Sequence, residues 1–206
     1  MILVRLKRDT GVKHHALERR LALLAPDLPR VLYQTYLARF YGYYAALEQR
    51  LIGFRAWPAV AVDYSGRHKT PQLESDLHIF GHTNATLARL PLCLDLPVLQ
   101  SPAQVLGCLY VIEGATLGGQ IITRHLAASL QITAQSGAAF FDGYGVRTGP
   151  CWREFGAALT AAAGLLQQDD AIVANANATF DTLSRWLFAH PALASASSQY
   201  PSTAHV

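Results

Sequence analysis

The chain has 206 residues, of which 51% are hydrophobic and 15% are charged. This composition fits one globular domain with a substantial core and excludes a disordered or fibrous protein. The formal net charge is only +3 and the basic residues are dispersed. We therefore expect no nucleic-acid partner, whereas an anionic small ligand is compatible with this charge.

The cellular environment is predicted from cysteine usage and apolar runs. Cys93, Cys108 and Cys151 form neither an even set nor a metal-binding C-x-x-C spacing, which favours a reducing compartment. Basic residues interrupt the N-terminal apolar run within its first eight positions, which leaves no signal-peptide core. No uninterrupted apolar run approaches the ~20 residues that cross a membrane. The sequence predicts a soluble cytoplasmic protein with no membrane partner.

Two helices are predicted at the start of the chain. In residues 3–24 apolar side chains recur every three or four positions, as on one face of a helix. This spacing places His14 on the inward face and turns His15 by about 100° towards solvent or the flank. After two prolines, a second helix is expected over residues 32–54, with a dense aromatic stripe that we interpret as core.

A connection and a short helix are predicted next. Residues 56–69 contain proline and glycine and are interpreted as a connection. Thr70 is the predicted cap of a helix that begins with Pro71 at its first position and runs to about Phe80.

A long helix bearing several glycines is predicted in the middle of the chain. Residues 89–101 are expected to form an ordered but non-helical crossing, after which a capping box of Ser101 and Gln104 starts a helix that runs to about Leu130. Each glycine inside it costs roughly 1 kcal/mol relative to alanine. Close helix packing and the approach of backbone to a flat ligand both explain them, and the segment alone favours packing. The glycines concerned are Gly114, Gly118 and Gly119.

The remaining sequence predicts two more helices and a tail. Residues 131–149 are loop-like, residues 150–166 form a helix, and a last helix follows Asp169 and stops near Pro191. No alternating strand pattern is visible, so the predicted fold class is all-α. The domain is expected to cover residues 1–191, and the Ser/Ala-rich residues 192–206 are expected to be a flexible tail.

An inward histidine on the first helix has two interpretations. His14 is either a core residue held by a hydrogen bond or a metal ligand. Glu18, one turn later, can accept a hydrogen bond from Nδ1 of His14 and leave Nε2 for a metal. Lys7, two turns earlier on nearly the same face, can meet a carboxylate of a ligand. An inward histidine on one helix and inward glycines on another form the geometry of a haem site with an open position for oxygen.

Three motifs together resemble the haem oxygenase family. They are Thr10-x-x-x-His14-x-x-x-Glu18, then Tyr110-Val111-Ile112-Glu113-Gly114-Ala115-Thr116-Leu117-Gly118-Gly119-Gln120, and finally Gly143-Tyr144-Gly145 through Thr148-Gly149 and Trp152. They occur in the family's order over residues 3–187. The similarity is greatest to the bacterial branch, which includes enzymes that supply biliverdin to bacteriophytochromes.

The resemblance implies a single-domain helical enzyme that holds haem between a proximal N-terminal helix and a glycine-kinked distal helix. Haem and its iron would be both cofactor and substrate, and O2 would be the co-substrate. Electrons from an external donor of the ferredoxin or flavoprotein reductase type would support cleavage to biliverdin, ferrous iron and carbon monoxide. The chain has no flavin, nicotinamide or iron–sulfur motif of its own. The biological role implied is iron acquisition, or biliverdin supply to a bacteriophytochrome.

The resemblance also assigns roles on the two faces of the haem. His14 would be the proximal iron ligand and Glu18 its hydrogen-bonding partner. Gly114 and Gly118 would let the distal backbone approach the iron. Many family members have an aspartate where this chain has Ala115, so protons are expected to arrive through backbone carbonyls and ordered water.

The haem edge and pocket wall have further candidates. Lys7 and Arg153 are the expected contacts of the propionates. Phe141 and Tyr144 either line the pocket or pack in the core. Weaker basic candidates are Arg124 and Arg147.

Two other functions fit parts of the pattern. A haem-binding or haem-delivery protein without turnover is motivated by Ala115. A helical small-molecule enzyme of the thiaminase-like type would share the fold without haem, and both His14 and the glycine motif argue against it. A haem-binding spectrum would separate the thiaminase-like enzyme from the two haem proteins. A turnover assay would separate a haem oxygenase from a haem-binding protein.

Overall fold

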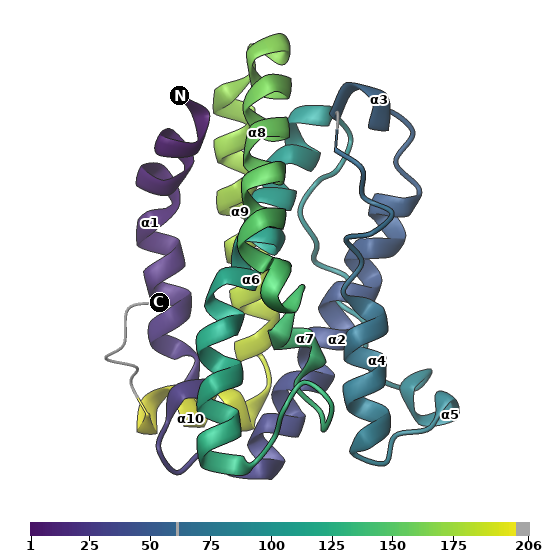
Figure 1. Ribbon diagram of the computed structural model, residues 1–206, viewed down its shortest axis with the longest axis vertical. Helices are drawn as coiled ribbons and strands as arrows, with labels where there is room; N and C mark the ends of the chain where they lie inside the picture. The colour runs from purple at the N-terminus through teal and green to yellow at the C-terminus, as the bar shows by residue number, and fades with distance from the viewer. Residues whose placement is uncertain (61, 201–206) are drawn as a thin grey trace.

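The computed structural model describes residues 1–60 and 62–200, and no strand is present in those two ranges (Figure 1). The all-α prediction is confirmed. The α-helices are α1 (Ile2–Arg20), α2 (Arg30–Ile52), α3 (Trp57–Val60), α4 (Thr70–Ile79), α5 (Asn84–Leu87), α6 (Pro102–Leu130), α7 (Ala139–Asp142), α8 (Thr148–Leu166), α9 (Asp169–Phe188) and α10 (Pro191–Gln199). Two 3-10 turns are η1 (Ala22–Leu24) and η2 (Gly145–Arg147).

The long helix α6 is the centre of the packing. It packs most extensively against α9 and also contacts α7, α8 and α3. A Cβ at Gly107 would lie 2.2 Å from the carbonyl oxygen of Ile172, and a Cβ at Gly119 would lie 2.3 Å from that of Phe141. Glycine at these two positions therefore lets the backbones of α9 and α7 touch α6. The helix is continuous from residue 102 to residue 130, so its glycines do not interrupt it.

By length and composition α6 could also cross a membrane. Its most apolar 18-residue window has a mean hydropathy of 1.5. We did not predict this from the sequence, because Glu113 interrupts the apolar run in the middle of the helix. In the structure 56% of that window is buried inside the protein, so a core helix also accounts for its apolar composition.

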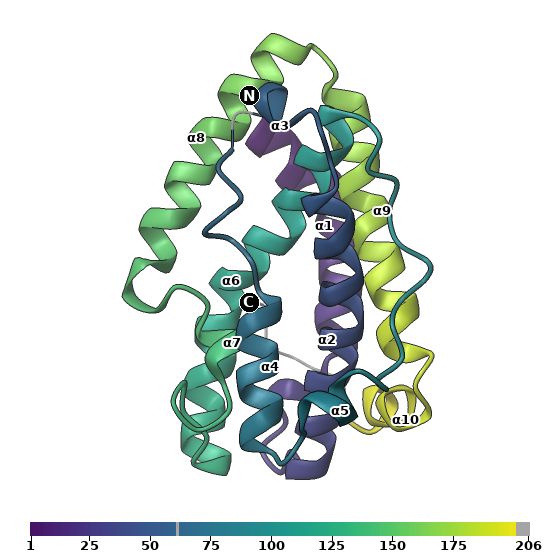
Figure 2. The ribbon, with the colours of Figure 1, turned by 90° about the vertical axis from the view of Figure 1, so that its right-hand side faces the viewer.

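The starts of α6 and α4 are capped in different ways, one by a residue next to the helix and the other by a residue of another helix. Ser101 caps α6 as predicted, since its hydroxyl accepts a hydrogen bond from the backbone N–H of Gln104 at 3.3 Å. The predicted cap of α4 is wrong, because Thr70 lies inside the helix. Instead the Glu48 carboxylate on α2 accepts the N–H groups of Lys69 at 2.6 Å and of Thr70 at 3.2 Å. Figure 2 shows α4 running beside α2.

The C-terminal segment differs from the expected flexible tail. Residues 191–199 form α10, which packs against α1, α2 and α9. Leu193 and Ala196 are buried there, and two apolar residues are too few for periodicity to reveal a helix. Residues 201–206 of the predicted tail lie outside the described residues. The predicted loop over residues 131–149 likewise contains α7 and η2.

A buried carboxylate holds α7 in place. Asp76 on α4 is fully buried and accepts hydrogen bonds from the backbone N–H of Ala139 at 2.8 Å and of Phe140 at 2.9 Å. These are the first amides of α7, which have no partner within their own helix. Asp76 thus orients Phe140 and the following Phe141, which both contact the ring of Phe40 on α2.

Asp76→Ala is expected to lower the free energy of unfolding by about 2–4 kcal/mol, because two buried N–H groups lose their acceptor. Burial raises the pKa of Asp76 to about 6, so the folded state favours the protonated carboxyl. The stability difference between wild type and variant should therefore shrink as the pH rises from about 4 to about 6. Urea unfolding across this range measures both effects, with the exposed Asp170→Ala as control. A difference that grows with pH would contradict the prediction.

Candidate functional site

The helices α1 and α6 approach each other at Thr10 and Tyr110. Burial raises the pKa of Tyr110, and the nearby Thr10 side chain opposes that shift. Thr10 is almost fully buried. Figure 1 shows both helices running from the top of the view towards the bottom. One turn beyond the contact, α1 therefore presents His14 and α6 presents Gly114.

Beyond that contact the two helices are more exposed to solvent. The side chain of His14 is 43% exposed, and its ring lies 5.6 Å from that of the buried Phe180 on α9. On α6, Ala115 is exposed, Leu117 is 41% exposed and Gly118 is half-buried. A half-exposed histidine and an exposed apolar stretch of a neighbouring helix are surfaces that a flat apolar ligand would cover.

His14 has the electrostatic character of a metal ligand. Burial lowers its pKa, and the nearby Glu18 carboxylate offsets part of this effect. A neutral imidazole, the form that binds metals, is therefore favoured at pH 7.

The ring nitrogen that contacts Glu18 differs from our prediction. Oε1 of Glu18 lies 3.1 Å from Nε2 of His14, whereas we expected Nδ1. Nε2 is the ring nitrogen farther from the backbone, and it reaches the carboxylate one turn along the helix. Binding iron through Nε2 therefore requires the ring to turn about its Cβ–Cγ bond.

Gly114 leaves space on α6 that is not needed for helix packing. A Cβ there would meet only the indole of Trp152, at an ordinary distance of 3.7 Å. Trp152 also contacts Tyr110, with 5.9 Å between ring centroids. At Gly107 and Gly119, by contrast, a Cβ would collide with backbone. Helix packing explains those two glycines but does not explain Gly114.

The two predicted propionate ligands lie on helices that pack together. Leu3 on α1 contacts α8, where its Cδ1 lies 3.1 Å from the Cβ position of Gly156. Figure 1 shows α1 and α8 running in opposite directions. The turn after Leu3 carries Lys7 and the turn before Gly156 carries Arg153, so both fall at a similar level, and both are exposed. Arg147, a weaker candidate, instead pairs with Glu154 at 3.6 Å.

Phe141 and Tyr144 lie on the other side of α6. Phe141 is buried and contacts the rings of Tyr33 and Phe40, so its contacts are those of a core residue. The hydroxyl of Tyr144 donates to the Glu113 carboxylate, at 2.9 Å from Oε1 and 3.0 Å from Oε2. The structure does not bring these two residues together with His14.

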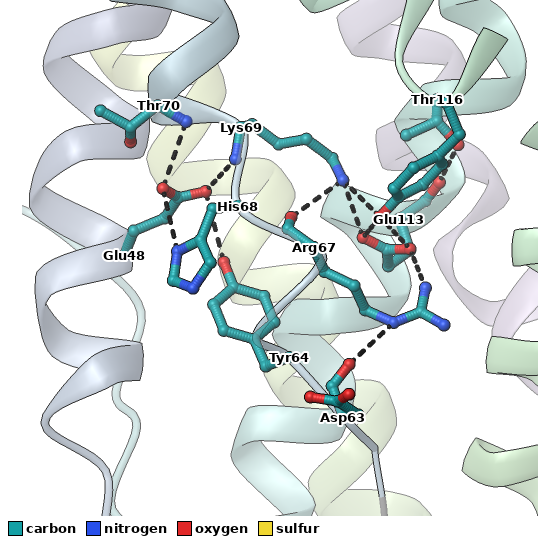
Figure 3. A network of polar contacts seen from close by, with 10 residues as sticks. Glu48, Asp63, Tyr64, Arg67, His68, Lys69, Thr70, Glu113 and Thr116 are labelled. Carbon is teal, nitrogen blue, oxygen red and sulfur yellow. Dashed lines mark hydrogen bonds and ion pairs between the residues drawn. The ribbon is translucent and has the colours of Figure 1, made fainter.

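Glu113, immediately before Gly114, is the centre of a buried charged network that we did not predict (Figure 3). Its side chain is 1% exposed. Nη1 of Arg67 donates to Oε2 at 2.5 Å, and Nζ of Lys69 donates to Oε1 at 3.1 Å. Nζ of Lys69 also donates to the Tyr144 hydroxyl at 2.6 Å. Burial lowers the pKa of Lys69, and the Glu113 charge opposes that shift.

A second buried glutamate completes the network from the side of α2. Glu48 accepts the N–H of Lys69 and, at 3.4 Å, the hydroxyl of Tyr64, and its Oε2 lies 3.6 Å from Nδ1 of His68. Figure 3 shows the segment before α4 lying between Glu48 and Glu113. The carboxylates of Glu48 and Glu113 thereby link α2 and α6 through the segment that precedes α4.

The sequence carried one signal of this network. Glu113 is the only charged residue between Pro102 and Ile122, and a carboxylate in the middle of an apolar helix is rarely buried without a partner. Its partners lie 46 and 44 positions away in the chain. Spacing along the sequence could predict that partners exist but not which residues they are.

Comparison with known proteins gives a family and a fold. The family model described as Heme oxygenase matches residues 1–189. The fold is similar to a haem oxygenase of Neisseria meningitidis, solved in NO- and CO-bound forms, with a TM-score of 0.75 and 19% identity over 92% of this chain and 91% of that one. It is also similar to haem oxygenase 2 of Chlamydomonas reinhardtii, solved without haem, with a TM-score of 0.68 and 21% identity over 92% and 97%. No curated protein sequence matches the chain.

Proposed function

The chain belongs to the haem oxygenase family, and we propose that it cleaves haem with molecular oxygen to biliverdin, ferrous iron and carbon monoxide at the site between α1 and α6. The observation that carries this proposal is the pair of a half-exposed His14 beside Glu18 on α1 and, on α6, a glycine at position 114 whose Cβ would meet no backbone. Haem supplies both the iron that activates oxygen and the ring that is cleaved.

His14 would hold the iron from the proximal side, with Glu18 as the partner that orients the imidazole. The lowered pKa of His14 supports this role, because the neutral ring is the ligating form. Glu18 is only 11% exposed and contacts Nε2 of His14 in this structure, so it would orient the ring through Nδ1 once the ring has turned.

Gly114 and Gly118 would form the distal wall. A glycine backbone brings N–H and carbonyl groups close to the iron, where a side chain would intrude. Ala115 carries no acid, but it is exposed, so water can reach this turn of α6. We assign proton delivery to that water and to main-chain carbonyls.

Lys7 and Arg153 would bind the propionates. Their charges face solvent from two helices that pack together, where they can meet carboxylates at the edge of the haem. Electrons would come from an external ferredoxin or flavoprotein reductase in the cytoplasm. The biliverdin would supply a bacteriophytochrome, or the reaction would serve iron acquisition.

Binding and turnover of haem by His14→Ala test the proposal. Wild type should give a Soret band, and with ascorbate or a reductase and oxygen this band should be replaced by biliverdin absorption. His14→Ala should lose turnover at least a hundredfold, because the iron loses its axial ligand, and added imidazole should restore part of it. His78→Ala, which alters an exposed histidine on α4, should behave as wild type.

Two outcomes would count against this function. Haem that stays unchanged in wild type under reductant and oxygen would indicate a haem-binding protein without turnover. A Soret band and turnover rate unaffected by His14→Ala would show that another residue binds the iron.

A further inference from the structure

The side chains of His14, His15 and Glu18 form a compact group of metal-ligand atoms on one side of α1. Each residue offers one ligand atom, and all three atoms lie within 4.8 Å of one another. The two oxygens of Glu18 are divided between the rings, since Oε1 lies 3.1 Å from Nε2 of His14 and Oε2 lies 3.1 Å from Nδ1 of His15. The carboxylate thus already lies between the two imidazoles.

Within this group, the glutamate is mostly buried and the two histidines are about half exposed. Glu18 is 11% exposed, whereas the side chains of His14 and His15 are 43% and 46% exposed. The two rings have centroids 5.4 Å apart, and Phe180 supports the ring of His14. Solvent therefore reaches the two half-exposed imidazoles, and the Glu18 carboxylate lies between them.

Two imidazole nitrogens and one carboxylate oxygen are a ligand set for zinc and for divalent iron, cobalt and nickel. At bond lengths near 2.0–2.1 Å, ligand atoms around a tetrahedral ion lie about 3.3 Å apart. Each histidine contact with Glu18 is close to this value, although the two contacts use different oxygens of the carboxylate. To bind one ion, the two imidazoles and the Glu18 carboxylate must draw together from the 4.8 Å within which their ligand atoms now lie, and water can fill the remaining position.

We propose that in the haem-free protein His14, His15 and Glu18 bind a divalent transition-metal cation, and that this cation excludes haem. The cation site stands on the geometry of the three side chains alone. The exclusion rests on the proposed function, because it requires that haem iron use the same His14. Haem loading would then depend on how much free divalent metal is present, including the ferrous iron that haem cleavage releases.

The test begins with haem-free protein titrated with Zn²⁺ by calorimetry and with Co²⁺ by visible absorption. Wild type should bind one equivalent of either ion. His15→Ala and Glu18→Gln should each weaken binding at least tenfold, while His78→Ala, an exposed histidine on α4, should leave it unchanged. Circular dichroism checks that the variants fold, and if Glu18→Gln does not, His15→Ala decides alone. Absence of saturable binding, or binding that persists in His15→Ala, would overturn the site as adventitious surface chelation.

The exclusion of haem is tested separately by adding haem to zinc-loaded protein. Zinc should reduce the apparent haem affinity of wild type at least tenfold but should have little effect on His15→Ala, which keeps His14. If zinc binds through His15 and Glu18 yet does not compete with haem, the cation site is supported and the exclusion is refuted. In that case His14→Ala in the Soret assay shows whether the assignment of the iron ligand has also failed.

Discussion

Glu113→Gln is expected to destabilise the fold by about 3–5 kcal/mol, because it removes one charge from a buried network and leaves its partners in place. Lys69 is 2% exposed, and no other carboxylate contacts its ammonium group among the described residues. Glutamine preserves the shape of the side chain but cannot neutralise Lys69 or Arg67. Chemical denaturation at pH 7 measures the loss.

A paired substitution separates loss of charge from loss of packing. Glu113→Leu combined with Lys69→Met removes both charges, and the double variant should be more stable than Glu113→Leu alone. The exposed pair of Arg185 and Asp95, with Nη2 and Oδ2 2.8 Å apart, provides the control. Asp95→Asn should cost less than about 1 kcal/mol. A loss equally small for Glu113→Gln would show that the network contributes little to stability.

The position of Glu113 connects this stability to the site. It precedes Gly114 on α6, and its partners lie on the connection before α4 and at Tyr144, the residue before η2. Breaking the network should therefore loosen the turn that carries Gly114. We expect Glu113→Gln to reduce haem turnover even at temperatures where the protein stays folded.

The features recovered from sequence are those that depend on neighbours along the helix. The buried Leu6, Thr10 and Leu17 of α1 follow from a three-to-four spacing, and the Ser101 cap follows from a local capping box. The predicted contrast between an inward His14 and an outward His15 is not seen, because their side chains are 43% and 46% exposed. Glu48 at the start of α4, Asp76 at the start of α7 and Glu113 beneath the glycines each act on residues 21 or more positions away. Such contacts depend on tertiary packing, which spacing does not encode.

The glycines of α6 also could be interpreted only in part from the sequence. Their number indicated that something must approach the helix, but the sequence could not tell a ligand from a neighbouring helix. The structure separates them, because a Cβ at Gly107 or Gly119 would lie 2.2 or 2.3 Å from a backbone carbonyl oxygen, whereas a Cβ at Gly114 would meet no backbone. The packing interpretation is therefore correct for Gly119, and the ligand interpretation remains for Gly114. Gly107, for which we made no prediction, is also a packing glycine.

Gly119→Ala and Gly114→Ala are expected to have opposite consequences. At Gly119 the new methyl would lie 2.3 Å from the carbonyl oxygen of Phe141, so the backbone of α7 must move. We expect a loss of about 2–3 kcal/mol in the free energy of unfolding, since overpacking exceeds the gain of roughly 1 kcal/mol in helix propensity. At Gly114 the methyl meets only the Trp152 indole at 3.7 Å, and the propensity gain should leave the protein as stable as wild type or slightly more so.

Haem turnover should rank the two variants in the reverse order. A methyl at Gly114 would intrude on the distal side of the haem, and the rate should fall roughly tenfold or more through misplacement of the reacting groups. Gly119→Ala should retain more activity per folded molecule, because Gly119 faces α7. Thermal unfolding and single-turnover rates, measured on both variants, decide the matter. A Gly114→Ala protein that is stable and turns over haem at the wild-type rate would show that this glycine does not form the distal wall.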